Sequence, residues 1–396
     1  MNAITLGTPS AITKGSPRLL FATLMLGMMA QGLAFTAFVS ALPQMAQALG
    51  SRGVFIAQMT MSLAALGLMC GALASGWVLE KLGTRVTLLT SLLIFGLIGA
   101  GGLVVSSPPL LLATRFAAGF AVACMVTTCV WGIAAAFDGD RRAKALGLSS
   151  SLANVSALTG TILGGYLARV GGWHLPFAQY LVFGVAAFAL AFIGIGQVKP
   201  DPDPITRASQ PFFKRLLPFY LLAAWLFAVL FMASTQYAFL LQQDGIADPA
   251  TRSLILATVT VTGALMAFIY GLLQKLLSAQ GTFLFGLVCM ILALAATGSG
   301  LTANLAFAVG CAVLMGIYAG LVLPYLYHSV TEKTDSPARS RAIGLLTAFG
   351  FFGGFLNPPV LLALARQIGL RNVFTVVSIG MLILAITTTV NLARKR

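Results

Sequence analysis

The ionisable side chains of this chain are few, and nearly all of them lie between long apolar segments. Arg115 is the exception, because it stands about seven residues inside an apolar segment, where an unpaired charge is expensive. We expect this side chain to face an aqueous cavity and to bind a substrate anion or relay protons. The alternatives are outward snorkelling or pairing with backbone carbonyls. The nine acids all lie in or at the edge of loops: Glu80, Asp138, Asp140, Asp201, Asp203, Asp244, Asp248, Glu332 and Asp335.

Polar and aromatic side chains near the middle of other apolar segments are candidates for a solute site. Gln31 and Phe35 are four residues apart and therefore share one face of a helix. Taken singly, such residues are more typical of packing or interhelical hydrogen bonds. Taken as a set around one cavity, they predict substrate contacts by Gln31, Phe35, Asn154, Gln236, Tyr237 and Tyr318.

The sequence argues against an enzyme. Its two histidines, His174 and His328, are widely separated and have no buried acid beside them, so no acid–base pair is assembled. We expect His328, near the end of its segment, to be structural rather than titrating. Five cysteines lie in apolar stretches without metal-ligand spacing, so we expect no disulfide, metal site or cofactor: Cys70, Cys124, Cys129, Cys289 and Cys311.

Composition places this chain in a membrane. Of its 396 residues, 59% are hydrophobic and 8% are charged, whereas soluble domains carry about 25% charged residues. The net charge of +15 does not indicate nucleic-acid binding, because the basic residues are scattered through short loops. The first apolar run is long enough to span a bilayer, which predicts an uncleaved helix rather than a signal peptide.

A membrane-spanning helix needs about 20 apolar residues, and twelve runs meet that length. The breaks carry charges and turn formers, although "TGSG" at 297–300 has no charge and marks the weakest break. We expect an all-α integral membrane fold with twelve spans near 18–42, 53–79, 84–106, 109–137, 143–168, 174–197, 212–242, 252–277, 280–300, 302–330, 338–365 and 372–393.

The lysines and arginines predict the orientation of these spans. With the N-terminus inside, inner segments hold eighteen of the 24 basic residues and outer loops hold five, among them Arg52 and Arg252. Because basic loops favour the cytoplasmic side, we expect a multi-pass protein of the inner (plasma) membrane with both termini in the cytoplasm.

The chain divides into two related halves. Shifting the sequence by 197 residues gives 11 identities over 59 ungapped positions, 119–177 against 316–374. A stretch with four prolines, "VKPDPDPITRASQPFFKR", follows the sixth span and is typical of a linker. We expect six-helix halves at 1–197 and 212–396, joined by a cytoplasmic linker at 198–211. Parallel repeats of this kind are a transporter architecture, with the solute bound between the repeats.

The segment "GWVLEKLGTR" carries the most specific motif, with Gly76, Glu80, Lys81, Gly83 and Arg85 in fixed spacing. In this spacing the chain resembles the major facilitator superfamily, and the resemblance covers nearly its whole length. The final base of the family motif is replaced by a valine, and the equivalent stretch at 271–281 keeps little more than a lysine.

The resemblance implies a gate. Gly76 and Gly83 would allow a tight loop and close helix approach. Glu80 would pack against the N-terminus of the eleventh helix, where the helix dipole favours a negative charge. Arg85 would pair with Asp138 at the inner end of the fourth helix. Such contacts would join the halves on the cytoplasmic side and stabilise the outward-open state.

Two further motifs match in part. Arg115 and Gly119 are similar to the fourth-helix pattern of drug–proton exchangers, but alanine replaces its usual glutamine. "GTILGG" is similar to the fifth-helix antiporter signature and keeps Gly160, Gly164 and Gly165, while threonine replaces the proline. Close helix packing is a sufficient reason for these glycines.

We therefore expect a secondary active transporter that works by alternating access. Proton-coupled efflux of a small organic solute is the first interpretation, and an uptake carrier or facilitator for a metabolite, including an anionic one, is the second. The partial antiporter motif supports efflux, whereas the lack of a mid-span carboxylate supports the second interpretation. The expected partners are a small-molecule substrate, the lipid bilayer and protons, with no nucleic acid, in a monomer. A receptor or scaffold would need neither the motif charges nor the repeat.

Overall fold

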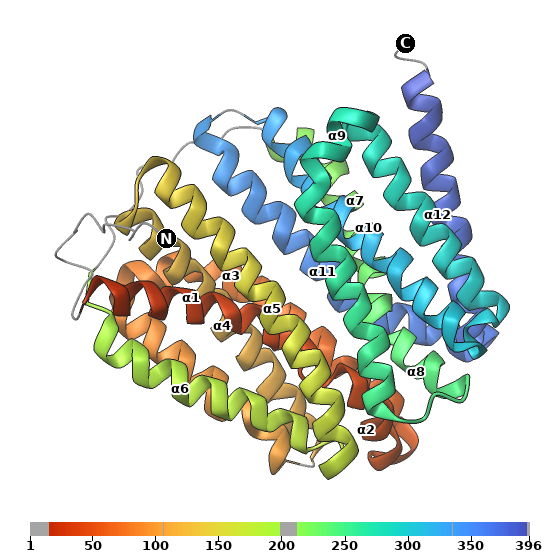
Figure 1. Ribbon diagram of the computed structural model, residues 1–396, viewed down its shortest axis with the longest axis horizontal. Coiled ribbons are helices and arrows are strands. Elements are labelled where there is room, and N and C mark those ends of the chain that lie inside the picture. The colour runs from red at the N-terminus through yellow and green to blue at the C-terminus, as the bar shows by residue number, and fades with distance from the viewer. Residues whose placement is uncertain (1–15, 106, 199–211, 335, 394–396) are drawn as a thin grey trace.

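The computed structural model describes residues 16–105, 107–198, 212–334 and 336–393, which are almost entirely helical. Ten helical segments are long and apolar enough to cross a membrane. Two of these segments, α3 and α9, each contain a backbone reversal, at Gly83 and at Ser278, so each crosses twice. This gives twelve crossings and confirms the predicted all-α membrane fold of two six-helix bundles (Figure 1).

The described elements follow the two halves in order. The first half holds α1 (Pro17–Thr36), η1 (Val39–Ala41), α2 (Leu42–Ala48), η2 (Gly50–Arg52), α3 (Gly53–Leu93), η3 (Ile94–Ile98), η4 (Gly99–Leu103), α4 (Pro108–Ala136), α5 (Gly139–Gly171), η5 (Leu175–Phe177) and α6 (Ala178–Gly194). The second half holds α7 (Phe212–Ser234), α8 (Gln236–Gln243), α9 (Pro249–Ser299), η7 (Leu301–Ala303), α10 (Leu305–Glu332), α11 (Ser336–Ile368) and α12 (Leu370–Ala393). The predicted linker lies almost wholly outside the described residues.

Local sequence explains where several helices begin and end. The Asp248 side chain caps α9 by accepting the amide of Thr251 at 3.0 Å. Gly300 ends α9 in the left-handed conformation, with φ 88°, which glycine adopts without a steric penalty. The uncharged "TGSG" break is therefore real.

The first helix of each half is broken, whereas the sequence predicted single helices at 18–42 and 212–242. The hydroxyl of Thr36 donates to the carbonyl of Gly32 at 2.9 Å, directly before the break between α1 and α2. The hydroxyl of Thr235 donates to the carbonyl of Phe231 at 2.6 Å, at the break between α7 and α8. Threonine bonded to the carbonyl four residues back often bends helices, and such a residue stands at both breaks.

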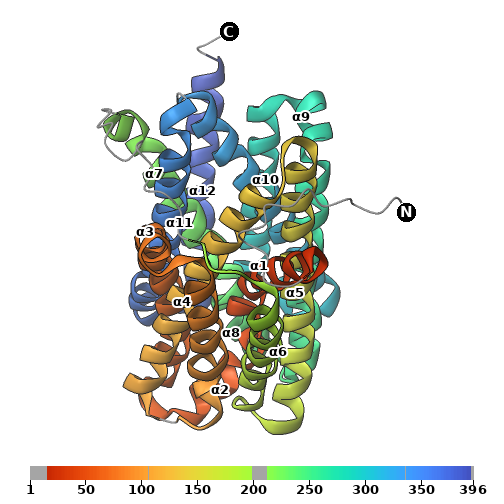
Figure 2. The ribbon, with the colours of Figure 1, turned by 90° about the vertical axis from the view of Figure 1, so that its left-hand side faces the viewer.

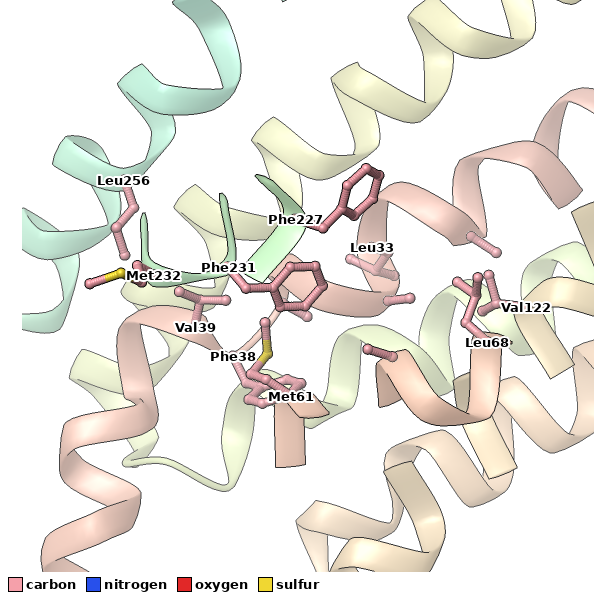
Figure 3. Packing of buried hydrophobic residues seen from close by; sticks show 14 of the residues in the cluster. Leu33, Phe38, Val39, Met61, Leu68, Val122, Phe227, Phe231, Met232 and Leu256 are labelled. Carbon is pink, nitrogen blue, oxygen red and sulfur yellow. The ribbon is translucent and has the colours of Figure 1, made fainter. Parts of the chain in front are cut away.

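The two bundles converge at one end of the molecule, where α2 and α8 lie (Figures 1 and 2). We call this the α8 end, and the opposite end, which carries the reversals at Gly83 and Ser278, the motif end. Helix α3 packs on α11 and α5 packs on α9 across the boundary between the halves. One apolar core runs across this boundary, and Figure 3 shows Phe227 and Phe231 of α7 among first-half side chains such as Leu33 and Met61.

Candidate functional site

Aromatic rings join the halves at their boundary. The ring of Phe35 on α1 lies 5.8 Å from that of Phe231 and 6.0 Å from that of Phe351 on α11. Phe227 extends the cluster, with its ring 5.8 Å from that of Phe351. Edge-to-face and stacked rings at these distances attract one another. Sequence reasoning found Phe35 but missed the other three, because nothing distinguishes them among 27 phenylalanines.

Two predicted polar residues also lie where a solute between the halves could reach them. Gln31 is half-buried one turn from Phe35. Asn154 is exposed on α5. It stands eleven residues before Gly165, which is about three helical turns, so the two residues lie on the same face of α5. Because Gly165 faces α9 of the other half, Asn154 lies on the α5 face that is turned toward the second half.

Gln236 is placed elsewhere, inside the second half at the break between α7 and α8. Its amide nitrogen donates to the side-chain oxygen of Asn357 on α11 at 2.6 Å, and its side-chain oxygen accepts from Thr235. Asn357 in turn donates to the carbonyl of Ala228 at 2.6 Å. This buried network connects α11 to the broken part of α7. Sequence reasoning missed Asn357, although an amide within an apolar segment was a usable signal.

Tyr237 and Tyr318 are also fully buried within the second half. The Tyr237 hydroxyl donates to the carbonyl of Ala308 on α10 at 2.7 Å. The Tyr318 hydroxyl donates to the carbonyl of Leu226 on α7 at 2.8 Å. Both are the interhelical hydrogen bonds typical of such residues, and the structure does not bring either hydroxyl to the boundary between the halves.

Arg115 lies inside the first half and is 1% exposed. Its guanidinium donates to the carbonyl of Gly99 in η4, and its carbon lies 4.8 and 4.9 Å from the ring centres of Phe177 and Tyr180. A third ring, that of Phe38, is 5.6 Å away. Carbonyls and aromatic faces can stabilise a cation without a carboxylate. This geometry favours pairing with backbone carbonyls over anion binding.

Arg252 holds the α8 end closed. The sequence placed it in an outer loop, but it is 0% exposed at the start of α9. Its guanidinium donates to the carbonyls of Ile246 at 3.1 Å and Ala247 at 2.9 Å, and across the boundary to that of Ser40 at 3.1 Å. A buried charge is tolerated because hydrogen bonds compensate for its lost hydration.

A second contact between the halves lies beside it. Nε of Arg169 on α5 is 3.8 Å from a carboxylate oxygen of Asp248. Partial burial raises the pKa of Asp248, but hydrogen bonds from Thr251 and Ala250 and the charge of Arg169 outweigh it and leave the pKa below its ordinary value. Because both side chains are substantially exposed, this pair contributes little compared with a buried one.

The glycines of α5 bring its backbone against both halves. A Cβ at Gly160 would meet Leu33 and Thr36 of α1, and one at Gly164 would meet the carbonyl of Ala37. A Cβ at Gly165 would instead overlap the side chain of Ser253 on α9. Gly165 therefore permits the contact between α5 and α9 that closes the α8 end.

At the motif end, the motif residues bind within their own half. Gly83 has φ 77°, which glycine adopts without strain, and forms the turn that the motif predicted. Arg85 donates to the carbonyls of Phe192 at 2.8 Å and Ile195 at 3.0 Å, at the end of α6. The side-chain oxygen of Gln197 accepts from the amide of Arg85 at 3.1 Å. The predicted pairing of Arg85 with Asp138 is therefore wrong for this conformation, because the helix end offers Arg85 carbonyl acceptors instead.

The remaining motif residues make no hydrogen bond or ion pair with the second half in the described part of the chain. Lys81 lies 4.2 Å from the ring centre of Trp77, one turn away. Asp138 is exposed and Glu80 is half-buried. Gly76 has open space where a Cβ would lie, so the close approach predicted for it does not occur in this conformation. The predicted contact of Glu80 with the start of α11 cannot be followed to its side chains, because those of residues 336–340 lie outside the described part of the chain.

Comparisons with known proteins agree with this architecture. The family model described as Major Facilitator Superfamily matches residues 24–247 and 241–395. The crystal structure of a POT family transporter in complex with 5-aminolevulinic acid is similar, with a TM-score of 0.78 at 11% identity, covering 93% of this chain and 95% of that chain. The nucleoside transporter NupG aligns with a TM-score of 0.74 at 15% identity, covering 94% of this chain and 99% of that chain.

The crystal structure of a D-xylose-proton symporter aligns with a TM-score of 0.70 at 14% identity, covering 92% of this chain and 97% of that chain. At such low identity these likenesses concern the fold. The two matches of the family model together cover nearly the whole chain. The chain belongs to the Major Facilitator Superfamily and is a transporter of small molecules.

Proposed function

We propose that the chain carries a small organic solute by alternating access, with Gln31, Phe35 and Asn154 contacting the solute between the halves. The observation that carries this proposal is the distribution of contacts between the halves. Arg252, Gly165 and the rings around Phe35 join the halves toward the α8 end. At the motif end, Arg85 and Gln197 bind within one half.

The motif end is the cytoplasmic end in this proposal. The excess of lysine and arginine in the segments at this end supports that orientation. The described conformation is then inward-open, in an inner membrane and with both termini in the cytoplasm. The outward-open state would form when the contacts around Arg252 break and Glu80 packs against the N-terminus of α11.

The solute is amphipathic in this proposal. Phe35, Phe231 and Phe351 offer aromatic faces, Gln31 and Asn154 offer amides, and Arg115 is occupied by its own half. The similar structures are named for a nucleoside, D-xylose and 5-aminolevulinic acid, which are small polar solutes. Because Arg115 is bonded within its own half, an anionic group on the solute is not required.

Proton-coupled efflux is our first proposal for direction, supported by the α5 glycines that resemble the antiporter signature. Gly165 stands where that signature meets the other half. Uptake or facilitated diffusion is the second proposal. It is supported by the position of all nine acids in or beside loops, which leaves no carboxylate at mid-span to carry a proton.

Proteoliposomes containing the purified chain test both proposals. Uridine, D-xylose and rhodamine 6G would be offered with and without a pH gradient. Phe35→Ala and Asn154→Ala should each lower transport of the accepted solute at least tenfold, whereas Leu276→Ala, on an exposed side chain outside the boundary, should not. Transport that depends on the pH gradient supports proton coupling, and gradient-independent equilibration supports a facilitator. Unchanged transport in both boundary variants would remove the proposed site.

A further inference from the structure

A cavity lies at the motif end, inside the second half. Its volume is about 610 Å³, within the range of small-molecule sites. The described residues that line it belong to α7, α9, α10 or α12, apart from Lys333, which directly follows α10. It is therefore separate from the site between the halves. The residues that matter for its chemistry are Gln274, Ser278, Tyr325, His328, Glu332 and Lys333.

The internal repeat shows that the residues at this cavity differ in character from their counterparts in the first half. Under the shift of 197 residues, "WGIAAAF" at 131–137 in α4 corresponds to "HSVTEKT" at 328–334. The buried ring of Phe137 packs edge-on against that of Phe21, at 5.8 Å. Its counterpart Thr334 has a small side chain that donates to the carbonyl of Val330 at 2.6 Å. The end of α4 in the first half is therefore apolar, whereas the corresponding end of α10 in the second half is polar.

The reversals of α3 and α9 differ in the same way. Two residues after Gly83 stands Arg85, which occupies the carbonyls at the end of α6. Two residues after Ser278 stands Gln280, which lines the cavity. Within the described residues, the position that corresponds to Arg85 therefore carries a neutral amide instead of a guanidinium.

Charges of both signs meet at the cavity. A carboxylate oxygen of Glu332 is 3.5 Å from Nδ1 of His328, and Nε2 of His328 is 3.2 Å from the amide nitrogen of Gln274. Nζ of Lys333 lies 5.4 Å from the ring centre of Phe219. The cavity wall thus carries an acceptor for an ammonium group and a donor for an anionic group.

The backbone beside the cavity is also unusual. Ser278 has φ 65°, a left-handed conformation that a non-glycine residue rarely adopts, and such strained positions cluster at ligand sites.

We propose that this cavity binds a small molecule that carries both an ammonium and an anionic group. Glu332 would accept the ammonium, and Lys333 would bind the anionic group. Gln274 would supply a neutral hydrogen bond. The site is an addition to the transport site and does not depend on which solute is carried.

Isothermal titration of the purified full-length chain with 6-aminohexanoate tests the proposal, because hexanoate and hexylamine each lack one of its charges. Saturable binding is expected, at least tenfold tighter than that of either analogue. Glu332→Gln and Lys333→Ala should each weaken binding at least tenfold. Lys275→Ala removes a nearby exposed lysine that does not line the cavity and should leave binding unchanged. His328→Trp, which introduces the side chain found at 131, should also abolish binding by filling the space.

Melting temperatures of these variants verify folding. Absence of binding, equal binding of either single-charge analogue, or binding retained in both Glu332→Gln and Lys333→Ala would overturn the proposal. A phosphatidylethanolamine headgroup carries the same pair of charges as a soluble zwitterion. Weaker titration in phosphatidylethanolamine nanodiscs than in phosphatidylcholine nanodiscs would assign the site to the lipid, and equal titration would assign it to a soluble ligand.

Discussion

The guanidinium of Arg252 donates a hydrogen bond of 3.1 Å to the backbone carbonyl of Ser40 across the boundary between the two halves. Arg252 makes two more backbone bonds within its own half, so its position is fixed before it reaches across. Opening the α8 end must separate the guanidinium of Arg252 from the carbonyl of Ser40, in a contact where Arg252 is 0% exposed. Arg252 is therefore the side chain whose removal should change the conformational balance most.

Arg252→Gln should populate the state that is open at the α8 end. Losing a buried hydrogen bond to a charged group removes about 1.5–3 kcal/mol, which corresponds to a shift of roughly tenfold to a hundredfold in population. Distances between spin labels on α2 and α8 report this shift. Asp248→Asn is the matched control, because asparagine still caps α9 while the exposed pair with Arg169 is lost. A larger shift in the control than in Arg252→Gln would contradict this assignment.

Gly165→Ala should also disfavour closure of the α8 end, because its Cβ would overlap the side chain of Ser253. Gly160→Ala adds the same methyl group against α1 within one half, where a flexible Leu33 side chain can move. The first variant should increase labelling of a cysteine placed at residue 40, whereas the second should mainly lower the melting temperature. Equal labelling in both variants would show that the contact of α5 with α9 does not limit access.

Arg115→Ala should lower the melting temperature by several degrees without a selective loss of solute affinity. The substitution leaves the carbonyl of Gly99 without its donor and removes three cation–π contacts, each worth about 0.5–2 kcal/mol. Arg115→Lys should recover part of the stability, because the charge persists without the planar fork. Thermal melts and ligand binding on the same preparations separate the two effects. A stable alanine variant that no longer binds solute would restore the anion-site interpretation.

Glu80→Gln should slow turnover while leaving the described conformation intact. In this conformation the Glu80 carboxylate is half-buried and pairs with no cation in the described residues. Its stabilising effect therefore belongs to the state that closes the motif end, through the dipole of α11. Exchange assays in proteoliposomes measure turnover, and cysteine labelling at the motif end measures the state. Normal turnover would remove the gating role of Glu80.

The two backbone reversals give a paired stability test. Ser278→Gly should raise the melting temperature, because glycine adopts φ 65° and ψ 166° without a strain of about 1–3 kcal/mol. Gly83→Ser should lower it, since φ is 77° and a Cβ there would overlap the Gln197 amide. The two substitutions should therefore change the melting temperature in opposite directions. A stabilising Gly83→Ser would show that the motif turn relaxes freely.

The fold was predictable because lipid imposes span length, and length is visible in the sequence. The gate was less predictable, because one sequence encodes both ends of the transport cycle. The motif predicts contacts that close around Glu80, whereas Arg85 of the motif binds carbonyls of its own half in the described conformation. Arg252 was counted among the outer-loop residues, although nearby carbonyls allow its burial. The reversal in α3 is at a glycine, Gly83, but the reversal in α9 is at Ser278. The sequence around Ser278 therefore gave no sign of a turn.

The directions in which the candidate solute residues point were predictable only in part, for a related reason. A polar residue within an apolar segment can be either a solute contact or a partner in an interhelical hydrogen bond. The two kinds of residue differ in the face of the helix on which they lie. Phe35 and Asn154 are turned toward the other half, whereas Tyr237 and Tyr318 are turned into their own. Which half a helix face is turned toward depends on how that helix packs against its neighbours. The sequence of the helix alone does not specify this packing.

The breaks behind α2 and α8 affect how fast the transporter can cycle. Each short helix is already separated from the long helix before it, at Thr36 and at Thr235. Swinging either one outward therefore need not rupture an intact hydrogen-bond ladder in the bilayer. The activation enthalpy of opening should then come from the contacts between α2, α8 and α9 rather than from the helices themselves. The turnover rate would accordingly respond to substitutions in these contacts far more than to substitutions that stiffen the long spans.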